Sequence, residues 1–157
     1  GNNGSGKTVL MKCICGFLPV SGGSVLVGGK YVGQEVDFPE SLGVIIETPG
    51  FLVNVSGRKN LEILANLRGK LSREDITRVL LKVGLDPDMK KPVGKYSLGM
   101  RQRLGIAQAI MEDPQLLILD EPFNGVDHHG VEEIRKILLE QKRRGKPSFW
   151  QVITVKI

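Results

Sequence analysis

The chain has 157 residues, of which 41% are hydrophobic and 25% charged, and its net charge is +5. These values are ordinary for one globular domain, and no apolar run approaches the roughly 18–20 residues that a membrane-spanning helix needs. The mildly positive charge is compatible with nucleic acid, an anionic membrane surface or a phosphorylated ligand, and it selects none of these partners.

The first third of the chain predicts a helix followed by short strands. The helix runs from Lys7 to about Gly16 and ends at that glycine. The stretch 24–32 predicts two strands around a Gly-Gly pair, which is a hairpin signal. The continuous apolar run Leu42–Ile46 predicts a buried strand.

The middle of the chain predicts helices and a loop. One helix covers 60–68 and follows Ser56, a candidate cap. A second helix begins at the N-cap Ser72, carries acids in its first turn and ends at Gly84. The stretch 86–97 is typical of a loop.

The last third predicts a helix, a strand and another helix. The first helix runs from Gly99 to about Met111, and the strand Gln115–Pro122 ends in two acids. The final helix, Val131–Arg144, has a basic last turn that suits the negative end of the helix dipole. Its basic residues there are Lys142, Arg143 and Arg144.

This alternation of strands and helices predicts an α/β fold with a largely parallel sheet, because each helix is long enough for a crossover connection. We expect the sheet core to comprise 1–47 and 98–157. The stretch 48–97 is mostly helix and loop, and we interpret it as an inserted helical subdomain.

The first eight residues, GNNGSGKT, match the phosphate-loop spacing G-x-x-x-x-G-K-[ST]. Glycines let successive backbone N–H groups point at phosphate oxygens, and the following helix adds its positive end. Lys7 supplies a charge for the β- and γ-phosphates, and the Thr8 hydroxyl can bind Mg²⁺. Taken alone, a glycine-rich turn with a chance lysine remains the alternative. The candidate phosphate-binding residues are Gly1, Asn2, Asn3, Gly4, Ser5, Gly6, Lys7 and Thr8.

An acidic pair, Asp120 and Glu121, ends the apolar strand in LLILDEP. One carboxylate there can hold Mg²⁺, and its neighbour can orient and deprotonate an attacking water. Alone, such a pair is usually a solvated strand end. Combined with a phosphate loop, it predicts a nucleotide hydrolysis site with Thr8 and Asp120 at the metal and Glu121 as the base.

The stretch YSLGMRQRLGIAQAI, residues 96–110, resembles the signature motif of ABC ATPases, in which L-S-G-G-Q precedes a basic, amphipathic helix. Ser97 and Gly99 match the motif, whereas Leu98 and Met100 depart from it. The phosphate loop, signature and acidic strand follow in the family's order over nearly the whole chain. The chain is therefore identified as a member of the ABC ATPase family with an incomplete phosphate-loop NTPase core.

Two further segments extend this resemblance. Residues 124–127, NGVD, resemble the family's D-loop, with Asp127 as its acid. Glu47 stands where the family usually has a glutamine, and its carboxylate can still meet Mg²⁺ or water. A capped, exposed strand end is the alternative for Glu47. The pattern ETPGF…N…SGRKNL from Glu47 onward is similar to exporters of the bacteriocin-immunity, antibiotic-resistance and multidrug branch.

The resemblance implies an ATP-hydrolysing subunit with ATP and Mg²⁺ as ligands. It implies a head-to-tail dimer, in which the signature residues Ser97, Leu98, Gly99 and Met100 reach the ATP of the partner subunit. It also implies a separate transmembrane permease, which would hold the chain at the cytoplasmic face of the membrane. We expect an exporter and no nucleic-acid partner. The alternatives are a soluble ABC-type protein acting on the ribosome or DNA, and a non-functional gene fragment.

Both ends of the chain depart from the family pattern. The family has a β-rich segment before the phosphate loop, so we expect an N-terminally truncated chain that binds nucleotide weakly and with little adenine selectivity. The tail 147–157 does not resemble the family's final strand and histidine. One choice of codons gives T-I-L-L-A-S-H-N-S-E after a one-base shift near Lys146, so we hypothesise that the tail is out of frame.

Two residue pairs are interpreted as structural. His128 and His129 lack the helical spacing of metal ligands, and a turn after the D-loop explains them better. Cys13 and Cys15 match no zinc, redox or disulfide spacing, so we expect reduced packing residues.

Overall fold

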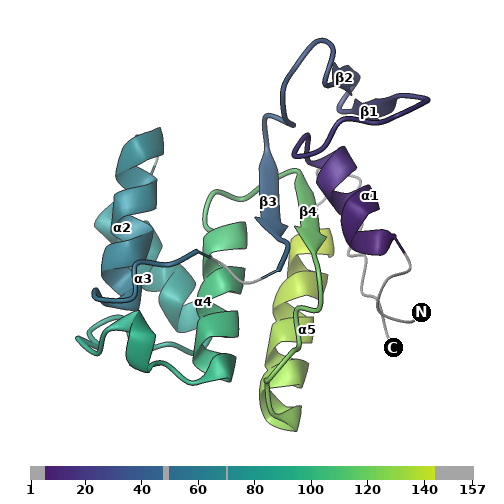
Figure 1. Ribbon diagram of the computed structural model, residues 1–157. Helices are drawn as coiled ribbons and strands as arrows, with labels where there is room; N and C mark the ends of the chain where they lie inside the picture. The colour runs from purple at the N-terminus through teal and green to yellow at the C-terminus, as the bar shows by residue number, and fades with distance from the viewer. Residues whose placement is uncertain (1–5, 48–49, 70, 144–157) are drawn as a thin grey trace.

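The computed structural model of the chain describes residues 6–47, 50–69 and 71–143. Its centre has three layers, which Figure 1 shows: a helix, a parallel strand pair and two further helices. In this order they are α1 (Lys7–Ile14), β3 (Leu42–Ile45) with β4 (Leu116–Leu119), and α4 (Leu98–Ile110) with α5 (His128–Arg143). The remaining elements are the hairpin β1 (Val25–Val27) and β2 (Lys30–Val32), the helices α2 (Gly57–Arg68) and α3 (Arg73–Lys82), and the short 3-10 helix η1 (Val93–Lys95).

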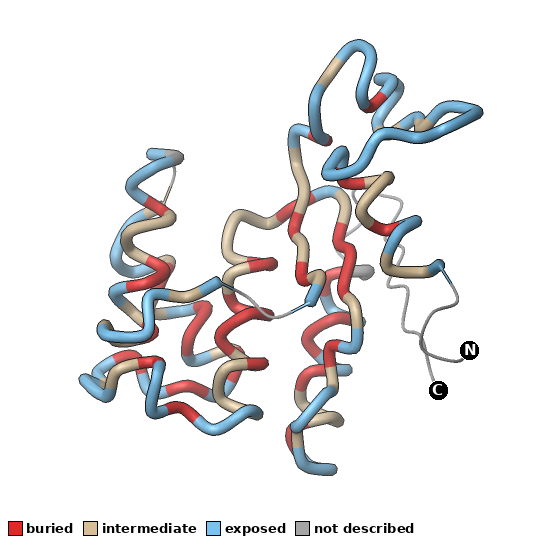
Figure 2. The backbone as a smooth tube through the Cα atoms, viewed as in Figure 1, coloured by how far each residue is buried: buried red, intermediate tan, exposed pale blue. Residues whose placement is uncertain are grey.

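The strand pair is apolar on both faces, as expected for a parallel pair covered by helices. Leu42 pairs with Leu116 and Ile45 with Leu119, so residues of the same face lie opposite each other. One face packs on Met11 and Cys15 of α1, and the other packs on the apolar stripes of α4 and α5. The α1 side contains Leu42, Val44, Ile46, Leu116 and Ile118, whereas the α4–α5 side contains Ile45, Leu117 and Leu119. Figure 2 shows β4 largely buried and β3 alternating between buried and intermediate residues, while the β1–β2 hairpin is largely exposed.

The cysteines lie where α1 ends and are free thiols, Cys13 half-buried and Cys15 buried. Cys15 packs with Met11 and Ile118, and burial raises the pKa of its thiol to about 11. A thiol this hard to ionise acts as a small apolar side chain, which agrees with the expected packing role.

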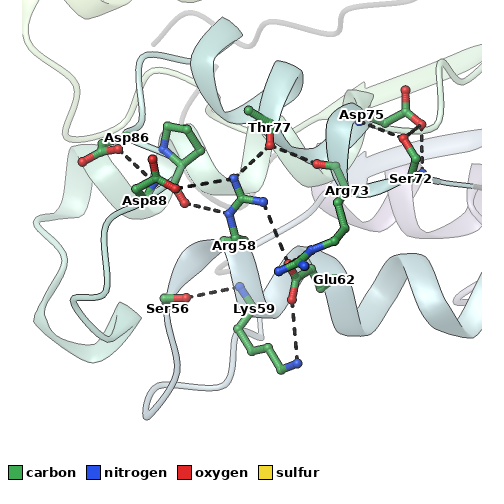
Figure 3. A network of polar contacts seen from close by, with 11 residues as sticks. Ser56, Arg58, Lys59, Glu62, Ser72, Arg73, Asp75, Thr77, Asp86 and Asp88 are labelled. Carbon is green, nitrogen blue, oxygen red and sulfur yellow. Dashed lines mark hydrogen bonds and ion pairs between the residues drawn. The ribbon is translucent and has the colours of Figure 1, made fainter.

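Helices α2 and α3 pack together and α3 packs beside α4, on the side of the molecule away from α1 (Figure 1). Figure 3 shows the polar contacts between them, centred on Arg58 of α2. Arg58 donates from Nε to the carbonyl oxygen of Pro87 at 2.8 Å and from Nη2 to the Thr77 hydroxyl of α3 at 2.9 Å. Because Arg58 is partly buried, these bonds hold α2, α3 and the following loop in one arrangement.

Side-chain caps explain where three of the helices begin. The hydroxyl of Ser56 accepts from the Lys59 N–H at the start of α2, and Ser72 forms a capping box with Asp75 at the start of α3. Ser97 caps α4 in the same way. The α2 helix therefore begins at Gly57, directly after its cap, and not at the predicted residue 60.

Three other predicted boundaries were wrong. The predicted loop 86–97 contains the 3-10 helix η1. Strand β4 ends at Leu119, so the acidic pair follows the strand and does not form its last residues. Helix α5 begins at His128, before the predicted Val131, because the Asp127 carboxylate accepts from the Gly130 N–H at 2.7 Å and caps the helix.

The predicted α/β class is confirmed, with a parallel pair at the centre and an antiparallel hairpin beside it. The division into core and helical subdomain stays a prediction, because one hydrophobic cluster includes residues of both parts, such as Leu61 and Leu117. The calls on residues 1–5 and on the tail 147–157 lie outside the described residues. Within the described ranges, no helix has the length and apolarity to cross a membrane.

Gly43 of β3 lets α4 approach the strand pair closely. A Cβ at this position would lie 2.0 Å from the Ala109 carbonyl oxygen and 2.8 Å from side-chain atoms of Leu117 and Pro114. We predict that Gly43→Ala lowers the free energy of unfolding by about 1–3 kcal/mol or more, because backbone must move to admit the methyl group.

Urea denaturation monitored by circular dichroism would measure this effect. Gly22→Ala is the matched control, since a Cβ at Gly22 meets nothing within 4 Å. A Gly43→Ala protein as stable as the control would show that the contact between α4 and β3 is looser than described.

Candidate functional site

The candidate site lies at the edge where β3 and β4 both end. Asp120 directly follows β4, and its backbone N–H donates to the Ile45 carbonyl oxygen at 2.7 Å. Thr8, in the first turn of α1, donates its hydroxyl to Asp120 Oδ2 at 3.0 Å. This contact joins residues 112 positions apart in the sequence. It places the phosphate-loop helix over the carboxyl ends of parallel strands, where α/β proteins commonly bind ligands.

The start of α1 has the features of an anion site. Gly6 precedes the helix in the left-handed conformation, with φ 75°, which a residue with a side chain rarely adopts. No acidic residue lies in the first turn, so the N–H groups and Lys7 leave a positive helix end. The other predicted loop residues, Gly1, Asn2, Asn3, Gly4 and Ser5, lie outside the described residues.

Glu121 also has left-handed backbone, with φ 47°, and its residue is exposed. This conformation is unfavourable for a residue with a long side chain and is often kept where a side chain must be aimed. Gln102 of α4 donates from Nε2 to the Glu121 carbonyl oxygen at 3.3 Å. Gln102 is 9% exposed, so a buried amide supports the turn that carries Glu121.

Glu47 lies two residues after the end of β3, and like Glu121 it has left-handed backbone, with φ 63°. Its carboxylate Oε1 lies 2.6 Å from Nζ of Lys12 on α1. Glu47 is thus at the same edge as Asp120, and its role as an oxygen ligand stays a prediction. Its carboxylate forms an ion pair with Lys12, which belongs to the phosphate-loop helix.

The donor set at this edge fits Mg²⁺. The Thr8 hydroxyl and the Asp120 carboxylate are adjacent oxygen donors, the ligand type that Mg²⁺ prefers. Nowhere in the part of the chain that the structure describes do three His, Cys, Asp or Glu side chains form a metal-binding group. A site with few protein ligands suits Mg²⁺, which usually keeps waters and binds substrate phosphates as well.

The signature residues begin α4, and Ser97 Oγ accepts from the Met100 N–H at 3.1 Å. Leu98, which departs from the family motif, is 49% exposed. A Cβ on Gly125 would lie 2.3 Å from Leu98 Cδ2, and one on Gly99 would lie 3.0 Å from the Gly125 carbonyl oxygen. The start of α4 therefore packs tightly against the segment that resembles the D-loop.

The phosphate-loop helix and the signature helix lie on opposite faces of the β3–β4 pair, as Figure 1 shows. Helix α4 therefore lies on the face of the strand pair that α1 does not cover. The structure brings together Thr8, Asp120, Glu121 and Glu47 at one edge and leaves Ser97, Leu98, Gly99, Met100 and Asp127 outside it.

The turn predicted at His128 and His129 is wrong, since both residues lie in the first turn of α5. His129 Nε2 lies 3.3 Å from Glu133 Oε1, one helical turn further along. Both histidines are exposed.

With this geometry in view, comparison with known proteins gives the family. The family model described as ABC transporter matches residues 1–124. The chain belongs to the ABC transporter family.

Several relatives of this chain have names that refer to transport. An uncharacterized ABC transporter ATP-binding protein of Bacillus subtilis is 42% identical over 145 residues, which are 92% of this chain and 66% of the relative. A bacitracin transport ATP-binding protein of Enterococcus faecalis is 48% identical over 139 residues, 88% of this chain and 45% of the relative. A lantibiotic transport ATP-binding protein of Streptococcus pyogenes is 40% identical over 145 residues, 92% and 62% of the two chains. The chain thus spans between 45% and 66% of these relatives' lengths.

Solved structures agree on the fold. The ATP-binding subunit of an ABC transporter superposes with a TM-score of 0.76 at 28% identity, covering 90% of this chain and 61% of that chain. A dimeric ATP-binding cassette in a post-hydrolysis state with ADP and Pi gives a TM-score of 0.79 at 20% identity, covering 91% and 67%. At that identity the second likeness shows the shared ABC ATPase fold alone.

Two residues that contact predicted site residues, Lys12 and Gln102, were not predicted from the sequence. Lys12 lies four positions after Thr8, on the same helix face, so its spacing was a usable signal. Gln102 gave no signal, because its contact with Glu121 depends on how α4 packs against the strand pair.

Arg103 of α4 connects its own helix to two other elements. It donates from Nη1 to the Val83 carbonyl oxygen after α3 and from Nη2 to Glu133 Oε2 of α5, both at 2.7 Å. The hydrogen bond from Arg103 holds the pKa of the Glu133 carboxyl below its usual value of 4.5. We predict that this carboxylate stabilises the fold above pH 4.5 and that the stabilisation is lost as the pH falls below it.

Unfolding free energies measured against pH for the wild type and Glu133→Gln would test this. The wild type is expected to lose stability more steeply below pH 4.5 than the variant, since only the wild type must protonate this group. Glu132→Gln, whose carboxylate pairs with Arg135 at 2.8 Å, is the control on the same helix. Parallel pH profiles for wild type and Glu133→Gln would contradict the assignment.

Proposed function

We propose that the chain is part of the ATP-binding and ATP-hydrolysing subunit of an ABC exporter. The observation that carries this proposal is the 3.0 Å contact between the Thr8 hydroxyl and Asp120. It joins the phosphate-loop helix to Asp120, the residue after β4, and Glu121 follows Asp120 directly. A phosphate loop, a metal-binding pair and an adjacent base are the parts that nucleotide hydrolysis requires.

The phosphate groups of ATP would be held by the loop that leads into α1. In this proposal the loop N–H groups and the positive helix end bind phosphate oxygens, and Lys7 adds a charge-assisted contact. Thr8 and Asp120 would hold Mg²⁺, which supplies charge neutralisation on the β- and γ-phosphates when bound. The residues assigned to ATP are Gly1, Asn2, Asn3, Gly4, Ser5, Gly6, Lys7 and Thr8.

Glu121 would act as the base of the hydrolytic step. Its carboxylate accepts a proton from the attacking water as the water oxygen bonds to the γ-phosphorus. The bond from that phosphorus to the β–γ bridging oxygen breaks, and ADP leaves with the electron pair. The left-handed backbone of Glu121 and the bond from Gln102 support this role, since they fix where the carboxylate starts.

Dimerisation is part of the same proposal. Helix α4, which the signature residues Ser97, Leu98, Gly99 and Met100 begin, packs on the face of the strand pair opposite to α1, so in this proposal these residues do not meet the nucleotide bound at Thr8. A partner subunit's nucleotide would meet them in a head-to-tail dimer, with Asp127 beside the interface. A solved cassette of the same fold is a dimer, which supports dimerisation.

The exporter assignment rests on relatives that are named for bacitracin and lantibiotic transport. These names favour transport over the alternative of a soluble protein that acts on the ribosome or DNA. A separate transmembrane permease would then hold the subunit at the cytoplasmic face of the membrane. We propose that the permease docks beside Glu47 and the helical segment that follows.

Lys7→Ala tests the phosphate site. We predict a loss of nucleotide affinity of about 10-fold or more, because a hydrogen bond from a charged group contributes roughly 1.5–3 kcal/mol. Titration with a fluorescent ATP analogue in the presence of Mg²⁺ measures the change. Lys90→Ala, which removes an exposed lysine in the loop after α3, is the matched control. If the wild type, Lys7→Ala and Lys90→Ala bind the analogue with equal affinity, Lys7 does not contact the phosphates.

Glu121→Gln separates binding from hydrolysis. In a form of the protein that turns over ATP, we predict that this change preserves nucleotide affinity and lowers hydrolysis by about 10²–10⁴-fold, the usual contribution of a general base. Phosphate release and nucleotide titration are measured on the same samples, with Glu74→Gln on exposed α3 surface as the control. Turnover by Glu121→Gln at the wild-type rate would exclude Glu121 as the base.

A further inference from the structure

A buried hydrogen bond joins the start of α2 to the residue that precedes the signature residues. The Gly57 N–H donates to Tyr96 Oη at 3.1 Å, and the two residues are 39 positions apart. Gly57 is the first residue of α2, so its N–H is among those that find no partner within a helix. The Tyr96 hydroxyl supplies that partner, whereas a phenylalanine would fill the same space and leave the N–H unsatisfied.

Backbone hydrogen bonds hold the same two segments together just before this point. The Val93 N–H donates to the Val55 carbonyl oxygen at 2.9 Å, and the Gly94 N–H donates to the Val53 carbonyl oxygen at 2.8 Å. A Cβ on Gly94 would lie 3.0 Å from that second carbonyl oxygen, so the two segments lie very close to each other. The bond to the Tyr96 hydroxyl completes this set of contacts, and the chain therefore enters the signature residues from a fixed point.

The signature residues have less burial of their own than the residue before them. Tyr96 is 6% exposed and belongs to the hydrophobic cluster that includes Leu61 and Leu117. Ser97 and Leu98, which follow it, are both exposed. Exposed side chains that meet another subunit must be held in place by the residues that support them. Tyr96 is the buried residue directly before them in the chain.

We propose that Tyr96 is a positioning residue for the signature residues: its hydroxyl, held on the Gly57 N–H, keeps the start of α4 where it meets the nucleotide of the partner subunit. This inference rests on the proposed function, because it concerns the head-to-tail dimer. Tyr96 acts through the residues that follow it. Without the hydroxyl, the start of α4 is free to occupy other positions, and only a fraction of the molecules is ready to dimerise.

The variant Tyr96→Phe tests the proposal, because it removes the hydroxyl and keeps the ring. Dimerisation with ATP and Mg²⁺ is measured by sedimentation velocity on a Glu121→Gln parent, which is expected to bind ATP without hydrolysing it. Tyr96→Phe should raise the dissociation constant of the dimer about two- to ten-fold, the range that the loss of one hydrogen bond allows. The affinity for a fluorescent ATP analogue, measured at concentrations at which the protein is monomeric, should stay unchanged.

Two control variants separate positioning from stability. Tyr31→Phe removes the same hydroxyl from the other tyrosine of the chain, which is 41% exposed in the hairpin. Ser72→Ala removes the cap of α3 and should lower the free energy of unfolding, as the loss of a buried hydrogen bond does. Both controls should dimerise like the parent. If Ser72→Ala weakens the dimer as much as Tyr96→Phe does, the effect follows from stability and the proposal is overturned.

Gly57→Ala changes the same contact from the other side. A Cβ on Gly57 would lie 2.8 Å from Tyr96 Oη and 3.1 Å from Leu104 Cδ1, so the added methyl group should displace the hydroxyl. We expect Gly57→Ala to weaken the dimer, and to weaken it less in the Tyr96→Phe background, where the nearest of these atoms is absent. Equal effects of Gly57→Ala in the two backgrounds would overturn the proposal.

The possible results distinguish this inference from the proposed function. If the parent fails to bind the ATP analogue, the proposed function fails and this inference fails with it. If the parent binds the analogue but stays monomeric with ATP at every protein concentration, the inference alone fails. The inference also fails alone if Tyr96→Phe dimerises as well as the parent, or if its main effect is a weaker affinity of the monomer for the analogue.

Discussion

The parallel pairing of β3 with β4 is the constraint on which the other parts depend. It joins segments that lie far apart in the sequence and fixes their register from Leu42 with Leu116 to Ile45 with Leu119. Each face of the pair receives its own helices, α1 on one side and α4 with α5 on the other. The same pairing ends both strands at one edge, so acids that follow each strand meet the phosphate-loop helix there. Packing and site geometry thus have a single origin.

Local signals in the sequence predicted local structure well. The hairpin β1–β2 depends on two adjacent glycines with positive φ, and α3 depends on Ser72 and Asp75 within one turn, so both are visible in a short stretch. The start of α5 was missed because Asp127 was assigned only to the D-loop resemblance, whereas its carboxylate also caps the helix. The spacing of Lys12 places it on the same helix face as Thr8, but the partners of Lys12 and Gln102 could not be predicted, since they depend on which strand end each helix meets.

Leu98 shows how a departure from a family motif is accommodated. A leucine where the ABC signature has glycine adds bulk at the start of α4, and the structure places that bulk against Gly125, which has no side chain. The close fit leaves little room for one segment to move without the other. The start of α4 and the D-loop segment therefore form one unit on the side of the strand layer that Thr8 does not occupy. In the proposed dimer, a displacement of the D-loop would be transmitted to the signature residues directly.

Glu47 and Glu121 share a further property with a consequence for folding. Both occupy backbone conformations with positive φ, at 63° and 47°, that glycine adopts far more readily than glutamate. Each position is therefore a point of local frustration, where the preference of the single residue opposes the geometry that the whole chain imposes. Such conflicts are resolved only after the strands and their covering helices are in place. The acidic edge is accordingly expected to be the last part of the centre to become ordered, and the first to yield when the strand pair loosens.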